Sequence, residues 1–192
     1  MEDCPRHREP GRSRRRVVAL ISVSALLRSG WIVLPLFAAC GGDQPLPTQP
    51  SLLTEPPATA VALEAEAGSG DGQVRERSRA SGGLTVHLGP GERRSWTFAL
   101  RAVQAQYAVA VTYANGKEGP NEMLHVAVDG KPVGSFQDRD SGDSVEGWNL
   151  FVTDPAGTST LGSGSHTLTL EVTGGDGCVE IDVVTLRPGG VA

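Results

Sequence analysis

Short runs of alternating apolar residues, separated by glycine-rich turns, fill the chain from residue 61 onward and constrain its fold more than any other feature. In "YAVAVTY" the apolar side chains recur at every second position, and the same alternation occurs in "RSWTFAL", "LHVAV", "HTLTLEV" and "CVEIDVVTL". Side chains two apart in a strand point to the same face, so each run predicts a half-buried β-strand. In the last run we expect Val179, Ile181 and Val183 to face inward.

The breaks between these runs carry the chemistry of tight turns. An Asn-Gly pair at 115–116 and an Asp-Gly pair at 129–130 are typical of hairpin turns that need positive φ angles. Looser glycine-rich loops are "GPG", "GSGS" and "TGGDG". Roughly eight to nine short strands at this spacing predict an all-β domain, a β-sandwich jelly roll, over residues 61–188, with 189–192 as a tail.

Residues 1–39 have the pattern of a bacterial signal peptide, with a basic start, "RHREPGRSRRR", and a mostly apolar continuation. The segment ends in "FAAC", which resembles a lipobox and predicts cleavage before Cys40 and lipidation of that cysteine. A transmembrane helix over residues 17–39 is the alternative, although Arg28 near its middle would be costly in a bilayer.

A proline-rich tether, residues 40–60, follows the signal segment. It holds five prolines and almost no charge, a composition that favours an extended, semi-rigid spacer. Together the two segments predict a domain held by lipid on a bacterial membrane, in the cell envelope, facing the periplasm or the surface.

The folded part is acidic. Residues 62–188 carry 17 Asp and Glu against 10 Lys and Arg. Nucleic-acid binding needs a basic patch to neutralise phosphates, so this balance argues against nucleic acid as a partner.

Two acidic pairs stand near the two ends of the domain. Glu64 and Glu66 lie two apart in the first predicted strand, and Glu180 and Asp182 lie two apart in the last. Like charges on one strand face repel unless something offsets them. If the first and last strands lie side by side, the carboxylates converge and suit Ca²⁺, which takes six to eight oxygen ligands. The alternative is two solvated acidic faces that never meet.

A further acidic stretch, "QDRDSGDSVEG" at 137–147, looks at first like a calcium loop. An EF-hand places glycine at its sixth position, whereas here Gly142 precedes Asp143. We therefore expect a solvated acidic loop, with a second ion site as the alternative.

The order of the motifs resembles a known family. "EAE", "ASGG", "YAVAVTYANG", "LHVAVDG", "GW", "GSHTLTL" and "VEIDVVTL" recur in this order in carbohydrate-binding modules of families 6 and 35, and the resemblance spans residues 62–188. It implies a jelly roll that binds poly- or oligosaccharide and carries a structural calcium. The ion's ligands would be Glu64, Glu66 and Asp182, with backbone oxygens near 81–83.

The resemblance also suggests where a saccharide would bind. The family's loop tryptophan matches Trp148, although a tryptophan can equally be core. Two features of the family are missing: a second aromatic near 73–83, where Arg75, Arg77 and Arg79 stand instead, and a late-loop asparagine, near which Asp176 is the closest polar group. These arginines could bind a uronic acid or sulfate, or form a solvated strand face. The candidate ligand residues are Trp148, Asn115, Asn149, Asp176 and Arg79.

A catalytic function is disfavoured by the sequence. Three histidines, His87, His125 and His166, are scattered, and neither a Gly-x-Ser-x-Gly elbow nor zinc spacing occurs. Each acidic pair lies on one strand, whereas glycoside hydrolysis needs two carboxyls flanking the substrate. We expect a non-catalytic, monomeric carbohydrate-binding domain, with its saccharide on the end loops or a sheet face. The alternative is a cell-surface interaction or structural domain that keeps the fold and ion without the glycan site.

Overall fold

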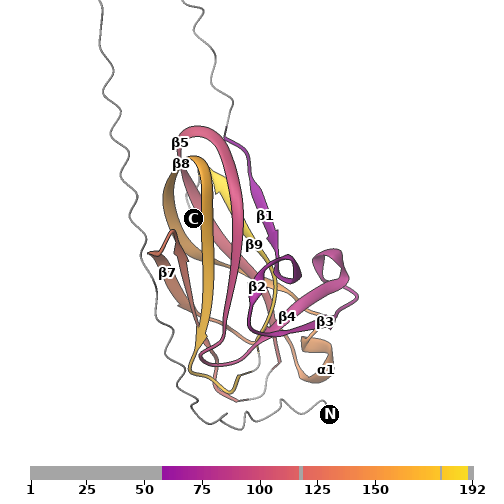
Figure 1. The fold of residues 1–192 in the computed structure, drawn as a ribbon. Coiled ribbons are helices and arrows are strands. Elements are labelled where there is room, and N and C mark those ends of the chain that lie inside the picture. Colours follow the sequence, from indigo (N-terminus) through magenta and orange to yellow (C-terminus); the bar gives the residue numbers. More distant parts are fainter. Residues whose placement is uncertain (1–57, 117–118, 178, 190–192) are drawn as a thin grey trace, which may run out of the picture. The chain divides into compact units, whose positions relative to one another are not determined.

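The computed structural model describes residues 58–116, 119–177 and 179–189, all of which belong to one unit of the chain. Antiparallel strands make up most of this part (Figure 1), so the predicted all-β jelly roll is confirmed. Three single helical turns connect strands: η1 (Ala65–Ala67), η2 (Ser81–Gly83) and α1 (Ser144–Gly147). The strands are β1 (Val61–Glu64), β2 (Ser69–Gly70), β3 (Gln73–Glu76), β4 (Leu84–Leu88), β5 (Arg93–Asn115), β6 (Met123–Val128), β7 (Lys131–Gln137), β8 (Val152–Thr173) and β9 (Val179–Pro188).

The two long strands, β5 and β8, organise the whole domain. They pair antiparallel along almost their full length, with a register shift between Leu100 and Gln104. The second half of β8 also pairs with β6, which pairs with β7, whereas the second half of β5 pairs with β9. The outer edge of β9 carries β1 and β4, and β3 lies beyond β4. One curled sheet therefore folds over itself, and β5 and β8 run side by side through it (Figure 1).

The length of β5 and β8 differs from the sequence prediction. "RSWTFAL" and "YAVAVTY" were expected to form two strands, but both belong to β5, and "HTLTLEV" is the end of β8. In β5 the physical reason is that no glycine or proline separates the two runs. In β8 the strand continues through "GSGS" at 162–165, which pairs with β5, so the predicted loop there was wrong. A local irregularity near residues 101–103 bends the strand without ending it.

The core consists of the alternating side chains that the sequence predicted. Tyr107, Val109, Val111 and Tyr113 are all at most 1% exposed. They pack with similarly buried residues from β4, β6, β8 and β9. Burying each large apolar side chain contributes about 1.5–3 kcal/mol, so the core is the main source of stability.

The inward alternation of β9 changes at Asp182. Thr112 pairs with Val183 and Tyr113 with Ile181, which leaves Asp182 without a partner in this ladder. A bulged residue shifts the alternation that follows it. Val184 is consequently buried, whereas Val183, predicted to face inward, is only half-buried, so that prediction was wrong.

The signal segment, the lipidation of Cys40 and nearly all of the 40–60 tether lie outside the described residues and stay predictions. Within the part that the structure describes, no helix is long and apolar enough to cross a bilayer.

Candidate functional site

The first and last strands of the domain lie side by side. β1 pairs antiparallel with β9, and Glu64, the last residue of β1, is opposite Val183, next to the bulged Asp182. Glu66 follows in the turn η1. The prediction that the opening and closing strands meet is therefore confirmed.

The three carboxylates of Glu64, Glu66 and Asp182 face one turn, η2. The backbone N–H of Ser81 donates to Asp182 Oδ1 at 2.8 Å, and the Ser81 hydroxyl donates to Glu64 Oε1 at 2.9 Å. A Cβ atom at Gly82 would lie 3.3 Å from Glu66 Oε1, so this side chain reaches the same turn. We call Glu64, Glu66, Asp182 and Ser81 the carboxylate site.

The turn that carries Glu66 is held from behind by β5. The buried guanidinium of Arg94 donates to the carbonyl oxygens of Ala65 and Glu66 at 3.1 and 3.3 Å. The indole of Trp96 donates to the Glu64 carbonyl at 2.8 Å. These three carbonyls are engaged, so the carboxylates are presented to η2 on a fixed backbone.

The electrostatics of the carboxylate site favour a bound cation. Burial, together with the charges of Glu64 and Glu66 and against the Ser81 hydrogen bond, raises the pKa of Asp182 to about 6. Glu64 Oε2 and Glu66 Oε2 are buried without a hydrogen-bond partner. Buried unpaired carboxylate oxygens are costly, and hard oxygen donors suit Ca²⁺, so the residues fit the ion. In the described ranges no three His, Cys, Asp or Glu side chains already have metal-binding geometry, so an ion would have to draw these carboxylates closer together.

Glu180, the fourth acid of the predicted convergence, has a different partner. Arg77 Nε donates to Glu180 Oε2 at 2.7 Å and Arg77 Nη2 to Oε1 at 2.5 Å, while Thr85 also donates to Oε2. Glu180 is 2% exposed, so this bidentate pair neutralises a buried charge. Of the three loop arginines, Arg77 is therefore structural and not part of a solvated strand face.

Trp148 follows α1 and is half-buried. The Arg77 guanidinium lies 5.8 Å from the centre of its ring, and the ring of His87 lies 6.3 Å away. A Cβ atom at Gly116 would lie 3.1 Å from the indole, a tight contact, so the ring packs closely against this glycine. Burial lowers the pKa of His87, which keeps the imidazole beside Trp148 neutral at pH 7. Trp148 is thus partly packed and partly accessible, which combines the two alternatives that the sequence left open.

A pocket of about 300 Å³ lies beside Trp148 in the chain and contains two of the predicted ligand residues. We call it the loop pocket; its lining residues are Ser78, Arg79, Glu146, Asn149 and Leu150. The Ser78 hydroxyl lies 3.4 Å from Asn149 Oδ1. The pocket gathers a guanidinium, a carboxylate, an amide and a hydroxyl around one exposed leucine, groups that can bind sugar hydroxyls and an apolar sugar face.

Asn115 and Asp176, the other two candidates, lie elsewhere. Asn115 is only 3% exposed, and its amide donates to Glu122 and Asp138 at 3.2 and 3.0 Å. Asp176 is exposed, and its carboxylate lies against Gly119. The structure therefore does not bring these two side chains into the loop pocket.

Asp138 and Glu122 are buried acids that sequence reasoning misjudged or missed. Asp138 was expected in a solvated loop, yet it is 3% exposed, so that prediction was wrong. The reason is its position directly after β7, where its side chain turns inward to Asn115 and the Glu122 backbone. Glu122 is fully buried, and its alternation with Leu124 and Val126 was the signal that could have revealed it.

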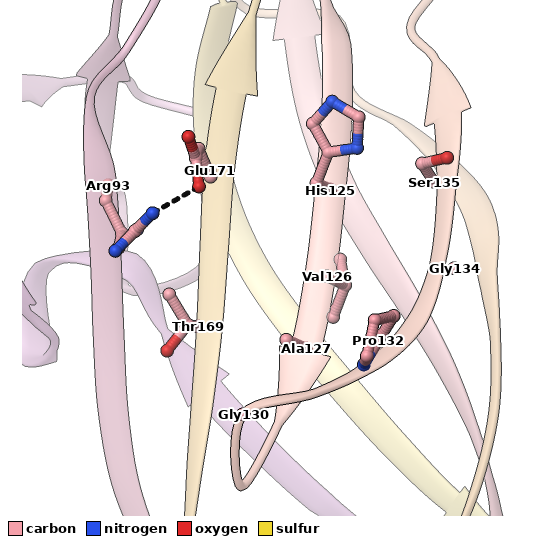
Figure 2. A pocket seen from close by; sticks show the side chains of 10 residues that line it. All are labelled: Arg93, His125, Val126, Ala127, Gly130, Pro132, Gly134, Ser135, Thr169 and Glu171. Atoms are coloured by element: carbon pink, nitrogen blue, oxygen red, sulfur yellow. Dashed lines mark hydrogen bonds and ion pairs between the residues drawn. The ribbon is translucent and has the colours of Figure 1, made fainter.

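A second hollow lies on the outer face of the β5–β8–β6–β7 strands. Its volume is about 440 Å³, and Figure 2 shows Arg93 and Glu171 forming an ion pair on one side and Pro132 and Ser135 on the other. His125 stands between them and interacts with Thr173 at 2.8 Å. We call it the sheet groove. Its residues alternate with core residues and have no sequence signature of their own.

Comparisons with known proteins find similarity in structure. No family model and no curated protein sequence matches the chain. A family 35 carbohydrate-binding module from Clostridium thermocellum matches with a TM-score of 0.57 and 21% identity, over 67% of this chain and 98% of that one. A carbohydrate-binding module of a Cellvibrio mixtus lichenase, in complex with cellotriose, matches with a TM-score of 0.54 and 18% identity, over 66% and 95%.

Larger enzymes match through a part of their length. The exo-β-1,3-galactanase of Phanerochaete chrysosporium has a TM-score of 0.53 and 25% identity over 68% of this chain, which covers only 30% of the enzyme. The fold is that of family 35 and family 6 carbohydrate-binding modules.

Proposed function

We propose that residues 61–188 form a non-catalytic carbohydrate-binding module that holds an oligosaccharide at the loop pocket. The fold it shares with carbohydrate-binding modules supports this function, and one of those modules is in complex with cellotriose. The observation that carries the site is the loop pocket itself, which combines Arg79, Asn149 and Glu146 with the exposed Leu150, two residues after Trp148 in the chain.

The groups of the pocket suggest how a sugar would bind. Asn149 and Arg79 would donate to ring and hydroxyl oxygens, and Glu146 would accept from hydroxyls. Leu150 and the accessible part of Trp148 would cover the apolar face of a pyranose ring. Arg77 would act as a positioning residue, because its guanidinium is fixed by Glu180 and lies over the Trp148 ring.

We further propose that Ca²⁺ stabilises the fold at the carboxylate site. Glu64, Glu66 and Asp182 would hold the ion, with backbone carbonyls near 81–83 completing the coordination. The ion would offset the two buried, unpaired carboxylate oxygens and pin β1 to β9. It would be structural and take no part in sugar binding, because neither pocket is lined by these residues.

The predicted signal segment, lipidation and tether at the N-terminus are part of the proposal. Lipid on Cys40 and the proline-rich tether would hold the module at a bacterial membrane, in the cell envelope, where saccharides of the envelope or medium are within reach.

A surface interaction domain is the second candidate. The Arg77 guanidinium covers the Trp148 ring, which leaves less indole surface for a sugar. This observation favours a domain that has kept the fold and has lost glycan binding.

A glycan array separates the candidates. The purified chain should retain at least one oligosaccharide. Asn149→Ala should lose it while keeping the wild-type melting temperature, and Trp148→Ala should lose it with a lower melting temperature but an intact fold, because this ring is partly packed. The matched control is His125→Ala in the sheet groove, which should bind as wild type. Retention that depends on His125 would move the site to the groove, and no retained glycan with or without Ca²⁺ would refute the proposed function.

A further inference from the structure

Three buried polar side chains meet at the strand ends near Trp148. Asn115 is the last residue of β5, Glu122 directly precedes β6, and Asp138 directly follows β7. Their exposures are 3%, 0% and 3%. We call these three residues the buried acid cluster.

Hydrogen bonds join the cluster into one unit. Asn115 Nδ2 donates to Glu122 Oε2 at 3.2 Å and to Asp138 Oδ2 at 3.0 Å. The Glu122 backbone N–H donates to Asp138 Oδ1 at 2.8 Å, and the Gly177 N–H donates to Glu122 Oε1 at 2.7 Å. Segments around residues 115, 122, 138 and 177 are therefore held together by two adjacent carboxyl groups.

Two carboxyl groups this close resist full ionisation. Burial and the charge of Glu122 raise the pKa of Asp138 to about 7, against the hydrogen bonds from Asn115 and the Glu122 backbone. Asn115 Oδ1 is buried and has no hydrogen-bond partner. If the amide turns over, that oxygen can accept a carboxyl O–H, so the cluster has an unused acceptor for an added proton.

Short contacts link the cluster to Trp148. The Asn115 N–H donates to Ser141 Oγ at 3.0 Å, and this hydroxyl lies 2.9 Å from the carbonyl oxygen of Gly147, the residue before Trp148. Gly116, which follows Asn115, pairs with Gly142 and packs against the indole. Movement of the end of β5 would thus be transmitted to Trp148 through Gly147, which precedes it in the chain, and through Gly116, which packs against its ring.

We propose that a proton held by the buried acid cluster tightens the strand ends that position Trp148, so that oligosaccharide binding strengthens as the pH falls from about 8 to about 6. With both carboxyls ionised, their repulsion loosens the Asn115 bridge and the loops that it joins. The inference rests on the proposed function, since it concerns regulation of the same site.

Other ionisable groups face these residues and define the controls. On the cluster side they are Tyr113, Arg139, Asp140, Asp154 and Asp176; on the Trp148 side they are Arg77, His87, Glu146 and Glu180. The pKa of His87 is lowered by burial, so this imidazole titrates below the cluster. The pKa of Tyr113 is raised, so the phenol stays neutral throughout.

The test follows the indole N–H resonance of Trp148 in the full chain by NMR, between pH 5.5 and 8.5 and without ligand; its assignment is the peak lost in Trp148→Phe. Wild type should show one transition near neutral pH, and Asp138→Asn should abolish it. Glu122→Gln serves the same purpose if Asp138→Asn fails to fold, and ¹³C shifts of the Asp138 carboxyl in wild type need no variant. His87→Gln is the matched control and should keep the transition.

Three outcomes would overturn the inference. They are a flat Trp148 resonance, a transition that disappears in His87→Gln, and a transition abolished by millimolar Ca²⁺, which would make the cluster a cation site.

Binding of cellotriose separates this inference from the proposed function. If cellotriose binds, its affinity should be about fivefold or more higher at pH 6 than at pH 8, the lower end of coupling between linked sites, and this ratio should vanish in Asp138→Asn. Binding that is equal at both pH values overturns the inference alone. If the Trp148 resonance shows the transition without ligand but the chain retains no glycan on the array, the result counts against the proposed function alone.

Discussion

The two acidic regions of the domain face the same problem of crowded negative charge but differ in how the charge is offset. Along β9, Glu180 is neutralised by Arg77, whereas Asp182 lies near Glu64 and Glu66, each of which has one buried carboxylate oxygen without a hydrogen-bond partner. At the strand ends, Glu122 and Asp138 share one neutral amide. In the first region Arg77 neutralises Glu180, and we propose Ca²⁺ for the other three carboxylates, whereas for the second region we propose a shared proton. Burial alone therefore does not decide what an acid binds; the donors around it do.

The largest expected effect concerns the Arg77 guanidinium, the cation that neutralises Glu180. Arg77→Met leaves Glu180 buried without its guanidinium, which should lower the free energy of unfolding by about 3–5 kcal/mol. Urea denaturation at pH 7 measures the change. Arg93→Met is the matched control, because Arg93 and Glu171 form the same kind of pair at the surface and should contribute at most about 1 kcal/mol. Equal losses in the two variants would show that burial of Glu180 does not matter.

The next effect concerns the proposed ion. Saturating Ca²⁺ should raise the melting temperature by about 10 °C over chelator, as expected for binding at about a hundred times Kd. Asp182→Asn should remove this difference. Asp138→Asn should keep it, and its loss there would erase the distinction between the two regions.

A smaller effect is the pH dependence of stability from Asp138. Its pKa is raised from 3.8 to about 7 in the folded state, so its stabilising contribution is complete below pH 3.8 and is lost as the pH rises through 7. In saturating Ca²⁺, wild type should lose about 2 kcal/mol of unfolding free energy between pH 5 and pH 8 that Asp138→Asn does not lose. Parallel curves for the two proteins would contradict the assignment of a proton to this region.

The smallest effect comes from a surface pair outside both regions. His166 Nδ1 lies 2.7 Å from Asp129 Oδ2, and this hydrogen bond raises the pKa of His166. The imidazolium stabilises the fold below pH 6.5, and the contribution disappears as the pH rises through the raised pKa. His166→Gln should therefore lower the melting temperature by about 2 °C at pH 5.5 and by less at pH 8.5. A larger fall in melting temperature at pH 8.5 than at pH 5.5 would contradict the stabilising role of the imidazolium.

The sequence predicted the elements whose cause is local. The alternation in "YAVAVTY" predicted a buried face, because period-two burial is a property of the strand itself. The pairing of Glu64 with the middle of β9 followed from the assumption that the first and last strands meet. Arg79 and Asn149 were both named as candidate ligand residues, but the pocket that joins them depends on loops far apart in sequence.

The features that sequence reasoning missed depend on three-dimensional register. A bulge at Asp182 moved burial from Val183 to Val184, and no residue type marks a bulge at that position. Asp138 looks like a solvated loop residue until β7 is placed against the end of β5. The partners of Arg77 were equally invisible, because Glu180 and Trp148 are distant in the chain.

β5 and β8 run through both halves of the folded sheet, the half with β6 and β7 and the half with β9, and this has a consequence for how the domain unfolds. Neither half can unfold while the other stays folded, because β5 and β8 belong to both. Amides near the sheet groove and amides beside β9 should accordingly exchange with solvent in one concerted opening, with a common free energy. A ligand bound at either end of the domain would then slow deuterium uptake across the whole sandwich.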